Sequence, residues 1–340
     1  MTTTSTNGRG RIAMTLTLET WPLNSPFQIT GYTWSELENI VVSLRKDNCC
    51  GRGEAAGVYY RNDRPQSMLR QLEALRGQIE TGITRESAQA LLPPGGARNA
   101  LDCALWDLEA KLTGQPAWRS AGLDLAPRPL VTTFTCGADD PEKMAAEAMK
   151  WRQAKAIKLK LTGERLDTER VRAVRAARPD VKLGIDANQG FTLPFLEWLL
   201  PVLVDSGVEL IEQPLPIGQE KLLLQLRSPI PLAADESAQS LKDLPGLVSL
   251  FQVVNIKLDK CGGLTEGLAM AKAAKELGLQ VMVGNMMGTA LAMAPGFILG
   301  QHCAHVDLDG ALSLRQDRHP PVDYSGGLIS CPPQVWGNQC

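Results

Sequence analysis

The stretch that decides the fold is residues 181–214, which read VKLGIDANQG FTLPFLEWLL PVLVDSGVEL IEQP. An apolar strand over 181–186 closes on Asp186, and a second strand over 210–212 closes on Glu212. Two short apolar strands separated by a longer segment are typical of a parallel βαβ unit. Each of the two strands thus carries a carboxylate at its C-terminal end.

The same rhythm continues on both sides of this stretch. Further apolar strands are expected at residues 130–135, 157–161, 232–235, 253–257, 281–283 and 306–309. Helical patterns separate most of them, for example at 168–177 and 265–277, whereas the Pro- and Gly-rich sequence after 309 gives little support to a final helix. Eight repeats of this kind favour a closed barrel, so we predict an α/β fold with a barrel over residues 128–314.

The first third of the chain has a different pattern. Residues 11–19 alternate polar and apolar side chains, a second apolar run lies at 38–45, and a turn is expected at 48–53. Helical patterns follow at 67–79 and 97–112. We therefore predict an α+β domain over residues 1–127, to which the tail at about 315–340 returns.

Composition excludes several classes of protein. The chain has 340 residues, 44% of them apolar, and a formal net charge of −2, so nothing suggests a nucleic-acid or membrane partner. The first ten residues are polar and lack the apolar core of a signal peptide, so we expect a cytoplasmic protein. The eight cysteines form no C-x-x-C pair and are expected to be reduced thiols. The sequence leaves a homo-oligomer open.

Three carboxylates end successive predicted strands. Asp186, Glu212 and Asp235 are 26 and 23 residues apart, which is one strand–helix unit each. Each one alone could be a helix cap or a loop carboxylate. Three together would repel one another unless a cation joined them, and oxygen ligands favour a hard divalent ion such as Mg²⁺. The C-terminal mouth of a barrel is also where barrel enzymes place their chemistry.

Lysines stand at two other strand ends. Lys158 and Lys160 are two residues apart and share one face of a strand, so we expect their crowding to lower the pKa of one of them and leave a neutral base. Lys257 ends the sixth strand, across the barrel from the second. A substrate between them would meet amines on both faces. The alternative is that these lysines are solvated or form salt bridges to the carboxylates.

A final pair of charges stands at the predicted eighth strand. Asp307 and Asp309 are expected to face the same way and could bind a cationic group of a substrate. An ordinary pair of loop carboxylates is the alternative.

These motifs together resemble a known family. Lys158-x-Lys160, Asp186-x-Asn188, Glu212-Gln213-Pro214, Asp235-Glu236-Ser237 and Lys257-x-Asp259-Lys260-x-Gly262-Gly263 are similar to the strand ends of the enolase superfamily, muconate-lactonizing subgroup. The resemblance covers nearly the whole chain. It implies a modified TIM barrel, (β/α)₇β, with an N-terminal α+β capping domain.

The resemblance also implies roles for individual residues. Asp186, Glu212 and Asp235 would bind Mg²⁺, Lys160 and Lys257 would be the two acid/base lysines, and Lys158 would help to hold the substrate carboxylate. The metal ligands would be supported from behind by Asn188, Gln213 and Glu236.

Within the subgroup, Asp307-x-Asp309 is similar to the element with which dipeptide epimerases hold the α-ammonium of the substrate. The implied reaction inverts the α-carbon of the C-terminal residue of a dipeptide such as L-Ala-L-Glu, by 1,1-proton transfer through a metal-stabilised enediolate.

The side-chain preference is less defined. Ala-Glu epimerases often carry an arginine soon after the Pro-Phe of their first loop, but Pro26-Phe27 is followed here by residues 28–32 without one. We expect Tyr32 in that loop, and Arg61 in a second loop at 59–63, to contact the substrate. An N-acylamino-acid racemase, an o-succinylbenzoate synthase or a cycloisomerase of the same subgroup stays open, and so does a non-catalytic, metal-stabilised barrel that binds a ligand.

Overall fold

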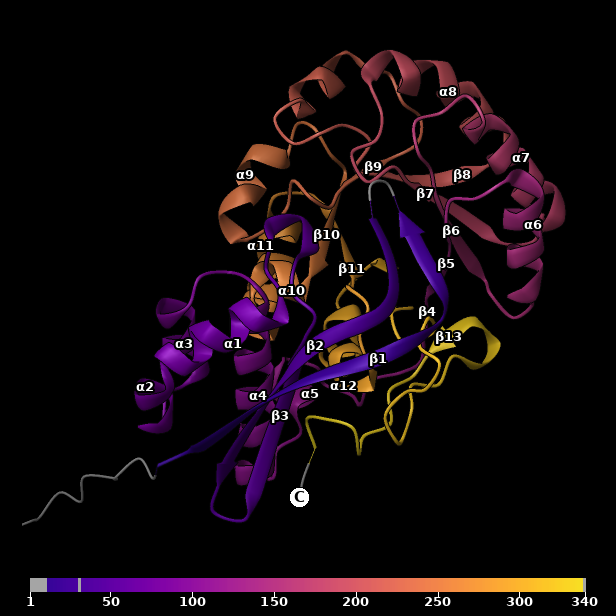
Figure 1. The fold of residues 1–340 in the computed structure, drawn as a ribbon. Coiled ribbons are helices and arrows are strands. Elements are labelled where there is room, and N and C mark those ends of the chain that lie inside the picture. Colours follow the sequence, from indigo (N-terminus) through magenta and orange to yellow (C-terminus); the bar gives the residue numbers. More distant parts are fainter. Residues whose placement is uncertain (1–10, 30–31, 339–340) are drawn as a thin grey trace, which may run out of the picture.

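The structure is a computed structural model that describes residues 11–29 and 32–338. It contains an antiparallel three-stranded sheet with helices and a parallel eight-stranded sheet surrounded by helices (Figure 1). The expectation of a polar tail over the first ten residues lies outside the described residues. No helix in the described part of the chain combines the length and the apolar character that crossing a bilayer requires.

The N-terminal domain is built on strands β1 (Ala13–Ile29), β2 (Tyr32–Lys46) and β3 (Cys49–Ala55). Its helices are η1 (Tyr59–Arg61), α1 (Pro65–Ala74), α2 (Arg76–Glu80), α3 (Arg85–Leu91), α4 (Gly96–Thr113) and α5 (Ala117–Ser120). The helix predicted over 67–79 is thus two helices, because the chain leaves helical geometry at Leu75 (φ −105°, ψ 2°).

The long helix α4 lies directly on the sheet. Gly51 and Gly53 of β3 face its backbone so closely that a Cβ added to either would come within 2.3 Å and 2.2 Å of α4 backbone atoms. Only glycine permits this approach. The close contact buries most residues of α4, so this helix is a central part of the domain core.

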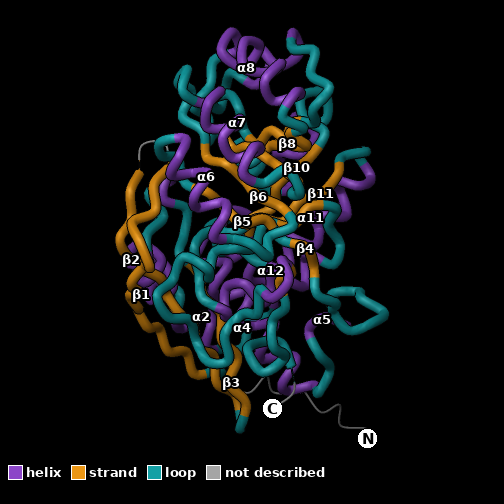
Figure 2. The backbone as a smooth tube through the Cα atoms, turned by 90° about the vertical axis from the view of Figure 1, so that its right-hand side faces the viewer, coloured by secondary structure: helices purple, strands orange, loops and turns teal. Residues whose placement is uncertain are grey.

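The barrel strands run in the order β5 to β12, each parallel to the next. They are β5 (Thr133–Cys136), β6 (Ala156–Lys160), β7 (Lys182–Asp186), β8 (Val208–Glu212), β9 (Leu232–Ala234), β10 (Val253–Lys257), β11 (Gln280–Gly284) and β12 (His305–Val306). The predicted barrel with an N-terminal domain is confirmed. Figure 2 shows β1 and β2 along one edge of the molecule and the barrel strands under α6, α7 and α8.

Seven connections link the eight parallel strands, and six of them contain α-helices. The following α-helices lie in these connections. They are α6 (Pro141–Lys150), α7 (Asp167–Ala177), α8 (Leu193–Asp205), α9 (Leu244–Leu247), α10 (Leu258–Cys261), α11 (Leu264–Glu276) and α12 (Ala290–Gly300). Between β8 and β9 the crossover holds only the 3₁₀ turn η2 (Glu220–Gln225), and η3 (Leu241–Asp243) precedes α9. No helix follows β12 before the short turn η4 (Ser325–Gly327) in the described chain, as the Pro- and Gly-rich sequence indicated.

The first and last predicted barrel strands need correction. Residues 130–135 form two strands, because β4 (Leu130–Val131) turns away to pair with β13 (Leu328–Ile329) of the tail. The eighth strand is shorter than predicted and ends at Val306, so Asp307 and Asp309 follow it instead of lying in it. A hydrogen bond connects the segments beside the first and last strands of the sheet: the backbone amide of Leu308 donates to the Thr132 hydroxyl at 2.9 Å.

The tail contacts both bodies of the molecule. β13 pairs with β4 beside the barrel, whereas the Trp336 indole donates to the Cys103 carbonyl in α4 at 2.9 Å. Arg318 of the tail also forms ion pairs with Glu19 and Glu54 of the N-terminal sheet. Through these contacts the tail connects the barrel to the N-terminal domain.

Candidate active site

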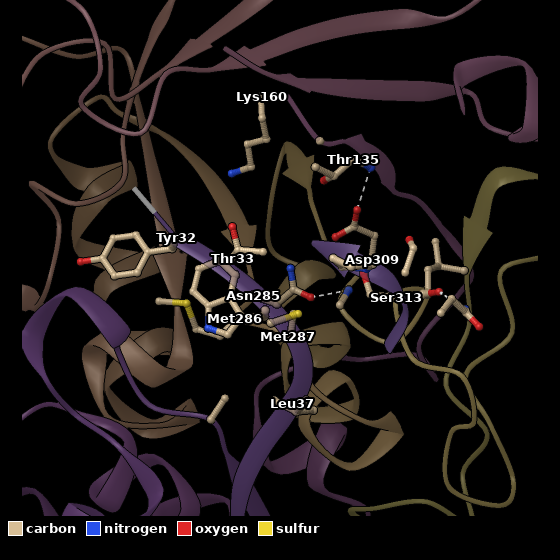
Figure 3. Close-up of a pocket in the computed structure, with 18 of the residues that line it drawn as sticks. Tyr32, Thr33, Leu37, Thr135, Lys160, Asn285, Met286, Met287, Asp309 and Ser313 are labelled. Atoms are coloured by element: carbon tan, nitrogen blue, oxygen red, sulfur yellow. Dashed lines mark hydrogen bonds between the residues drawn. The ribbon is translucent and has the colours of Figure 1, made fainter. Parts of the chain in front are cut away.

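A pocket of about 810 Å³ lies where the barrel mouth meets the N-terminal domain. From the barrel it is lined by Lys158, Lys160, Lys257, Asp307 and Asp309, and from the N-terminal domain by Tyr32, Trp34 and Tyr59. Figure 3 shows Lys160, Tyr32 and Asp309 on three sides of this pocket. The two bodies of the chain therefore build one site together.

The three predicted carboxylates form a compact group. Asp186 and Glu212 end neighbouring strands in matched register, and Asp235 follows β9 directly. One oxygen from each lies within 4.8 Å of the others, and all three side chains are buried. Burial first, and then the charge of Asp186, raise the pKa of Glu212 to about 7.

This group fits a hard divalent cation. Three buried carboxylates repel one another, and a cation between them would remove both the repulsion and the cost of burial. The donor set consists of carboxylate oxygens, which is the chemistry that Mg²⁺ prefers. Behind the group, Glu236 Oε2 is buried and has no hydrogen-bond partner among the described residues, so the site holds more negative charge than its own donors satisfy.

Lys158 and Lys160 point into the barrel from β6, as their spacing predicted. Lys160 Nζ lies 2.6 Å from Asp186, and Lys158 Nζ contacts Asp307 and lies 3.4 Å from Glu212. The expectation that crowding lowers a lysine pKa is wrong for Lys158. Burial does disfavour its charge, but Asp307, Glu212 and Asp186 outweigh burial and raise the pKa of Lys158.

Lys257 approaches from the other side. It ends β10, four strands from β6 in a sheet of eight, and its Nζ lies 2.6 Å from Asp235. Burial opposes its charge, but Asp235 and the other two carboxylates raise its pKa. The structure thus places one lysine amine on each side of the carboxylate group.

Two further residues hold the carboxylates, and the sequence reasoning gave them no role. The buried Lys260 ammonium contacts the carboxylate and the carbonyl of Asp235 and donates to the Asn255 carbonyl at 3.0 Å. Asn255 Nδ2 donates to Glu212 at 2.7 Å. Asn255 could have been found, because it lies two residues before Lys257 on β10 and must share its inward face.

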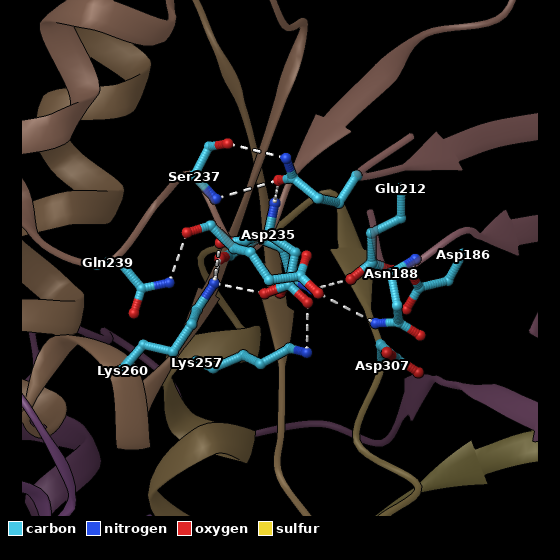
Figure 4. A network of polar contacts seen from close by, with 12 residues as sticks. Asp186, Asn188, Glu212, Asp235, Ser237, Gln239, Lys257, Lys260 and Asp307 are labelled. Atoms are coloured by element: carbon cyan, nitrogen blue, oxygen red, sulfur yellow. Dashed lines mark hydrogen bonds and ion pairs between the residues drawn. The ribbon is translucent and has the colours of Figure 1, made fainter. Parts of the chain in front are cut away.

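The three residues predicted to support the carboxylates form hydrogen bonds close to them, and Figure 4 shows Asn188 beside Asp186 and Glu212. The Asn188 amide group accepts from Lys160 at 3.0 Å and donates to Glu236 at 3.3 Å. Gln213 Oε1 accepts from the backbone amide of Asp235 at 2.9 Å, which holds the start of the turn that follows β9. Burial, and then the charge of Asp235, raise the pKa of Glu236 to about 8.

Asp307 and Asp309 line the pocket but have different surroundings. Asp307 is buried and bound by Lys158 and the Thr133 hydroxyl, which hold its pKa below the ordinary value although burial opposes them. Asp309 is half-buried and accepts from the Thr135 amide at 2.8 Å. Burial and the neighbouring Asp307 raise the pKa of Asp309.

The two residues predicted to contact the substrate, Tyr32 and Arg61, have different positions relative to the pocket. Tyr32 lines the pocket and packs edge-on against Tyr59, with 4.5 Å between ring centroids. Arg61 is exposed, and its guanidinium donates to Gln239 and to the Pro94 carbonyl instead of lining the pocket. The sequence placed Arg61 in the correct loop but could not give the direction of its side chain.

The chain is similar in sequence to proteins of known activity. The chain is 38% identical over 313 residues to the L-Ala-D/L-Glu epimerase of Escherichia coli, covering 92% of this chain and 97% of that protein. It is 39% identical over 253 residues to an N-acetyl-D-glutamate racemase of a Pseudoalteromonas species, covering 72% of this chain and 78% of that protein.

Solved structures of dipeptide epimerases and a related protein are also similar to this chain. An enolase family member from Agrobacterium tumefaciens with homology to dipeptide epimerases, solved with sodium and L-Ala-L-Glu, matches with a TM-score of 0.93 and 38% identity over 96% of this chain and 100% of that one. A dipeptide epimerase from Methylococcus capsulatus, complexed with Mg and L-Arg-D-Lys, matches with a TM-score of 0.87 and 27% identity over 95% of this chain and 97% of that one.

Two family models account for most of the sequence. Residues 11–122 match the mandelate racemase / muconate lactonizing enzyme N-terminal domain, and residues 142–334 match the enolase C-terminal domain-like family. Barrel, N-terminal domain and carboxylate group agree with this assignment. The chain belongs to the enolase superfamily, in the mandelate racemase and muconate lactonizing enzyme group.

Proposed function

We propose that the chain is a Mg²⁺-dependent dipeptide epimerase, an isomerase that inverts the α-carbon of the C-terminal residue of a dipeptide by 1,1-proton transfer. The epimerase from Escherichia coli and the dipeptide-bound structure from Agrobacterium tumefaciens support this proposal, since both match nearly the whole chain. The pocket supports it as well, because two opposed lysines and an aspartate pair line one space, and each of these lysines pairs with the carboxylate group behind it.

The chemical problem is the weak acidity of a proton next to a carboxylate. Asp186, Glu212 and Asp235 would hold the Mg²⁺ ion, which when bound offsets the negative charge that gathers on the substrate carboxylate. Lys160 and Lys257 now pair with these carboxylates at 2.6 Å. Once the carboxylates serve the cation, both amines can turn to the substrate.

The two lysines then work from opposite faces. One amine removes the α-proton from its face, and the other returns a proton from the opposite face, so the centre inverts. Lys158 lies between the carboxylate group and Asp307 and would help to hold the substrate carboxylate. Neither catalytic lysine needs to form a covalent bond to the substrate.

One observation carries the choice of a dipeptide: Asp307 and Asp309 line the same pocket as the two lysines. A dipeptide presents a carboxylate at one end and an ammonium group at the other, and the aspartate pair suits the ammonium. An N-acylated amino acid has no such group. The racemase of the Pseudoalteromonas species nevertheless makes N-acylamino-acid racemisation the second candidate function.

Deuterium exchange distinguishes these functions. The purified chain with Mg²⁺ is incubated in D₂O with a library of L-Ala-X dipeptides and, separately, with N-acetyl and N-succinyl amino acids, and incorporation is followed by mass spectrometry. We expect exchange and epimerisation of free dipeptides. Faster turnover of the N-acyl compounds would replace this proposal with the racemase, and no exchange with any compound would favour a binding barrel without catalysis.

We also propose the cytoplasm as the place of action. For the same chain we propose a capping domain of residues 1–127, completed by about 315–340, and a catalytic barrel of residues 128–314. The tail contacts to Glu54 and Cys103 support this division.

A further inference from the structure

The side chain of Gln239 uses every hydrogen-bonding group it has. Its Nε2 donates to the Tyr60 hydroxyl at 2.8 Å and to the Glu236 carbonyl at 2.7 Å (Figure 4 shows the second bond). Its Oε1 accepts from Arg61 at 3.1 Å. Gln239 therefore joins two residues of the N-terminal domain to the turn after β9, four residues beyond Asp235.

The same contacts reach the pocket through aromatic packing. The Tyr60 ring meets the Tyr59 ring at right angles, with 5.0 Å between centroids. Tyr59 lines the pocket and packs edge-on against Tyr32 at 4.5 Å and Trp34 at 5.1 Å. A shift of Tyr60 would therefore move the aromatic wall formed by Tyr32, Trp34 and Tyr59.

We propose that Tyr60, Arg61 and Gln239 form a latch that fixes the loop 57–64 over the pocket, with Arg61 and Gln239 as positioning residues and not as substrate contacts. The inference rests on the proposed function for its kinetic test. It assigns Arg61 a different task from the one its loop position suggested, because both of its described bonds go to protein oxygens outside the pocket.

The latch has a defined kinetic consequence. Without it the loop spends part of its time open, and substrate binding must then supply the cost of closing it, which weakens apparent affinity without changing the chemistry. Arg61→Ala removes the Arg61 bonds to Gln239 and Pro94, and Gln239→Ala removes the bonds to Arg61, Tyr60 and Glu236. Because both substitutions break the connection between the loop and Gln239, we expect each to raise KM about fivefold. We expect kcat to change by less than about twofold, since neither residue touches the reacting atoms.

The decisive test compares substrates and combines variants. A latch predicts the same change in KM for dipeptides with acidic and with neutral C-terminal residues. It also predicts that Arg61→Ala/Gln239→Ala is no worse than Gln239→Ala, because the bond between the two residues is already absent in Gln239→Ala and the other Arg61 bond, to Pro94, stays within the N-terminal domain. Arg70→Ala, an exposed arginine on α1, serves as the matched control and should leave KM unchanged. A loss confined to acidic substrates, or multiplying effects in the double variant, would overturn the latch.

Hydrogen exchange tests the latch without any substrate. The Gly57 amide donates to the Asp259 carboxylate beside the barrel at 2.8 Å, so opening of the loop would break this bond and expose the amide. We expect faster exchange over residues 57–64 in Arg61→Ala and Gln239→Ala, and also in Tyr60→Phe, which loses only a hydroxyl. Unchanged exchange in all three would overturn the latch, whereas a lack of epimerisation with altered exchange would count against the proposed function alone.

Discussion

Replacement of Asp309 by asparagine isolates the charge that would bind a substrate ammonium group. Asp309 is half-buried, and its described hydrogen bonds come from Thr135, whose backbone amide donates at 2.8 Å. An asparagine oxygen can accept the same bond, so Asp309→Asn removes a negative charge and little else. Asp307 is less suitable, because its replacement would leave the buried Lys158 without its shortest partner.

The size of the effect follows from these surroundings. A hydrogen bond to a charged group contributes about 1.5–3 kcal/mol when the partner is removed. That range corresponds to about 10- to 150-fold in binding of the free dipeptide. Asp309 is half-buried, so we expect a value inside this range and not below it.

Paired substrates supply the assay. The ratio kcat/KM is measured for L-Ala-X and for N-acetyl-X with the same C-terminal residue, in wild type and in Asp309→Asn, by deuterium exchange. We expect a loss of about 10-fold or more for the free dipeptide and less than about threefold for the acetylated compound. Equal losses for both compounds would mean that Asp309 does not bind an ammonium group of the substrate, and the dipeptide assignment would be refuted.

Four further substitutions test the site and its surroundings. Lys160→Ala and Lys257→Ala should each abolish epimerisation yet exchange the α-proton of opposite epimers; exchange of the same epimer in both variants would mean that a single base works. Asp186→Asn should weaken Mg²⁺ binding at least about 100-fold by calorimetry, and activity that survives excess EDTA would contradict the metal assignment. Burial raises the pKa of Asp259 from 3.8 to about 7, so the folded state favours its neutral form, and this stabilising contribution is complete below about pH 4 and lost as pH rises through 7. Asp259→Asn should therefore gain stability over wild type at pH 8, by up to about 4 kcal/mol in urea unfolding, and a difference that does not vary with pH would exclude this cause.

Sequence was sufficient for what depends on periodicity. Lys158 and Lys160 share the inward face of β6 because strand side chains alternate, and Asp186 and Glu212 become neighbours because parallel strands pair in register. Neither conclusion needs tertiary detail. The same argument would have found Asn255, two residues before Lys257 on one strand.

What the sequence could not give depends on partners that are distant along the chain. The strand expected over 130–135 divides because the tail supplies β13 as a partner for Leu130–Val131. The pKa of Lys158 is raised and not lowered, because Asp307, 149 positions away, contacts it. The direction of Arg61 depends in the same way on Gln239, which only the folded barrel brings within reach.

The charges around the pocket argue for a divalent ion together with a zwitterionic substrate. At the inner end of the pocket, beside the barrel strands and apart from the charged residues of the outer wall such as Glu147 and Lys150, six carboxylates face four ammonium groups when all are ionised. This leaves two negative charges: Asp186, Glu212, Asp235, Glu236, Asp307 and Asp309 against Lys158, Lys160, Lys257 and Lys260. A divalent cation would balance this excess. A dipeptide with a neutral side chain then adds no net charge, whereas an N-acyl amino acid adds a negative one that the site would have to neutralise. The charge balance therefore favours a free dipeptide independently of the geometry of Asp307 and Asp309.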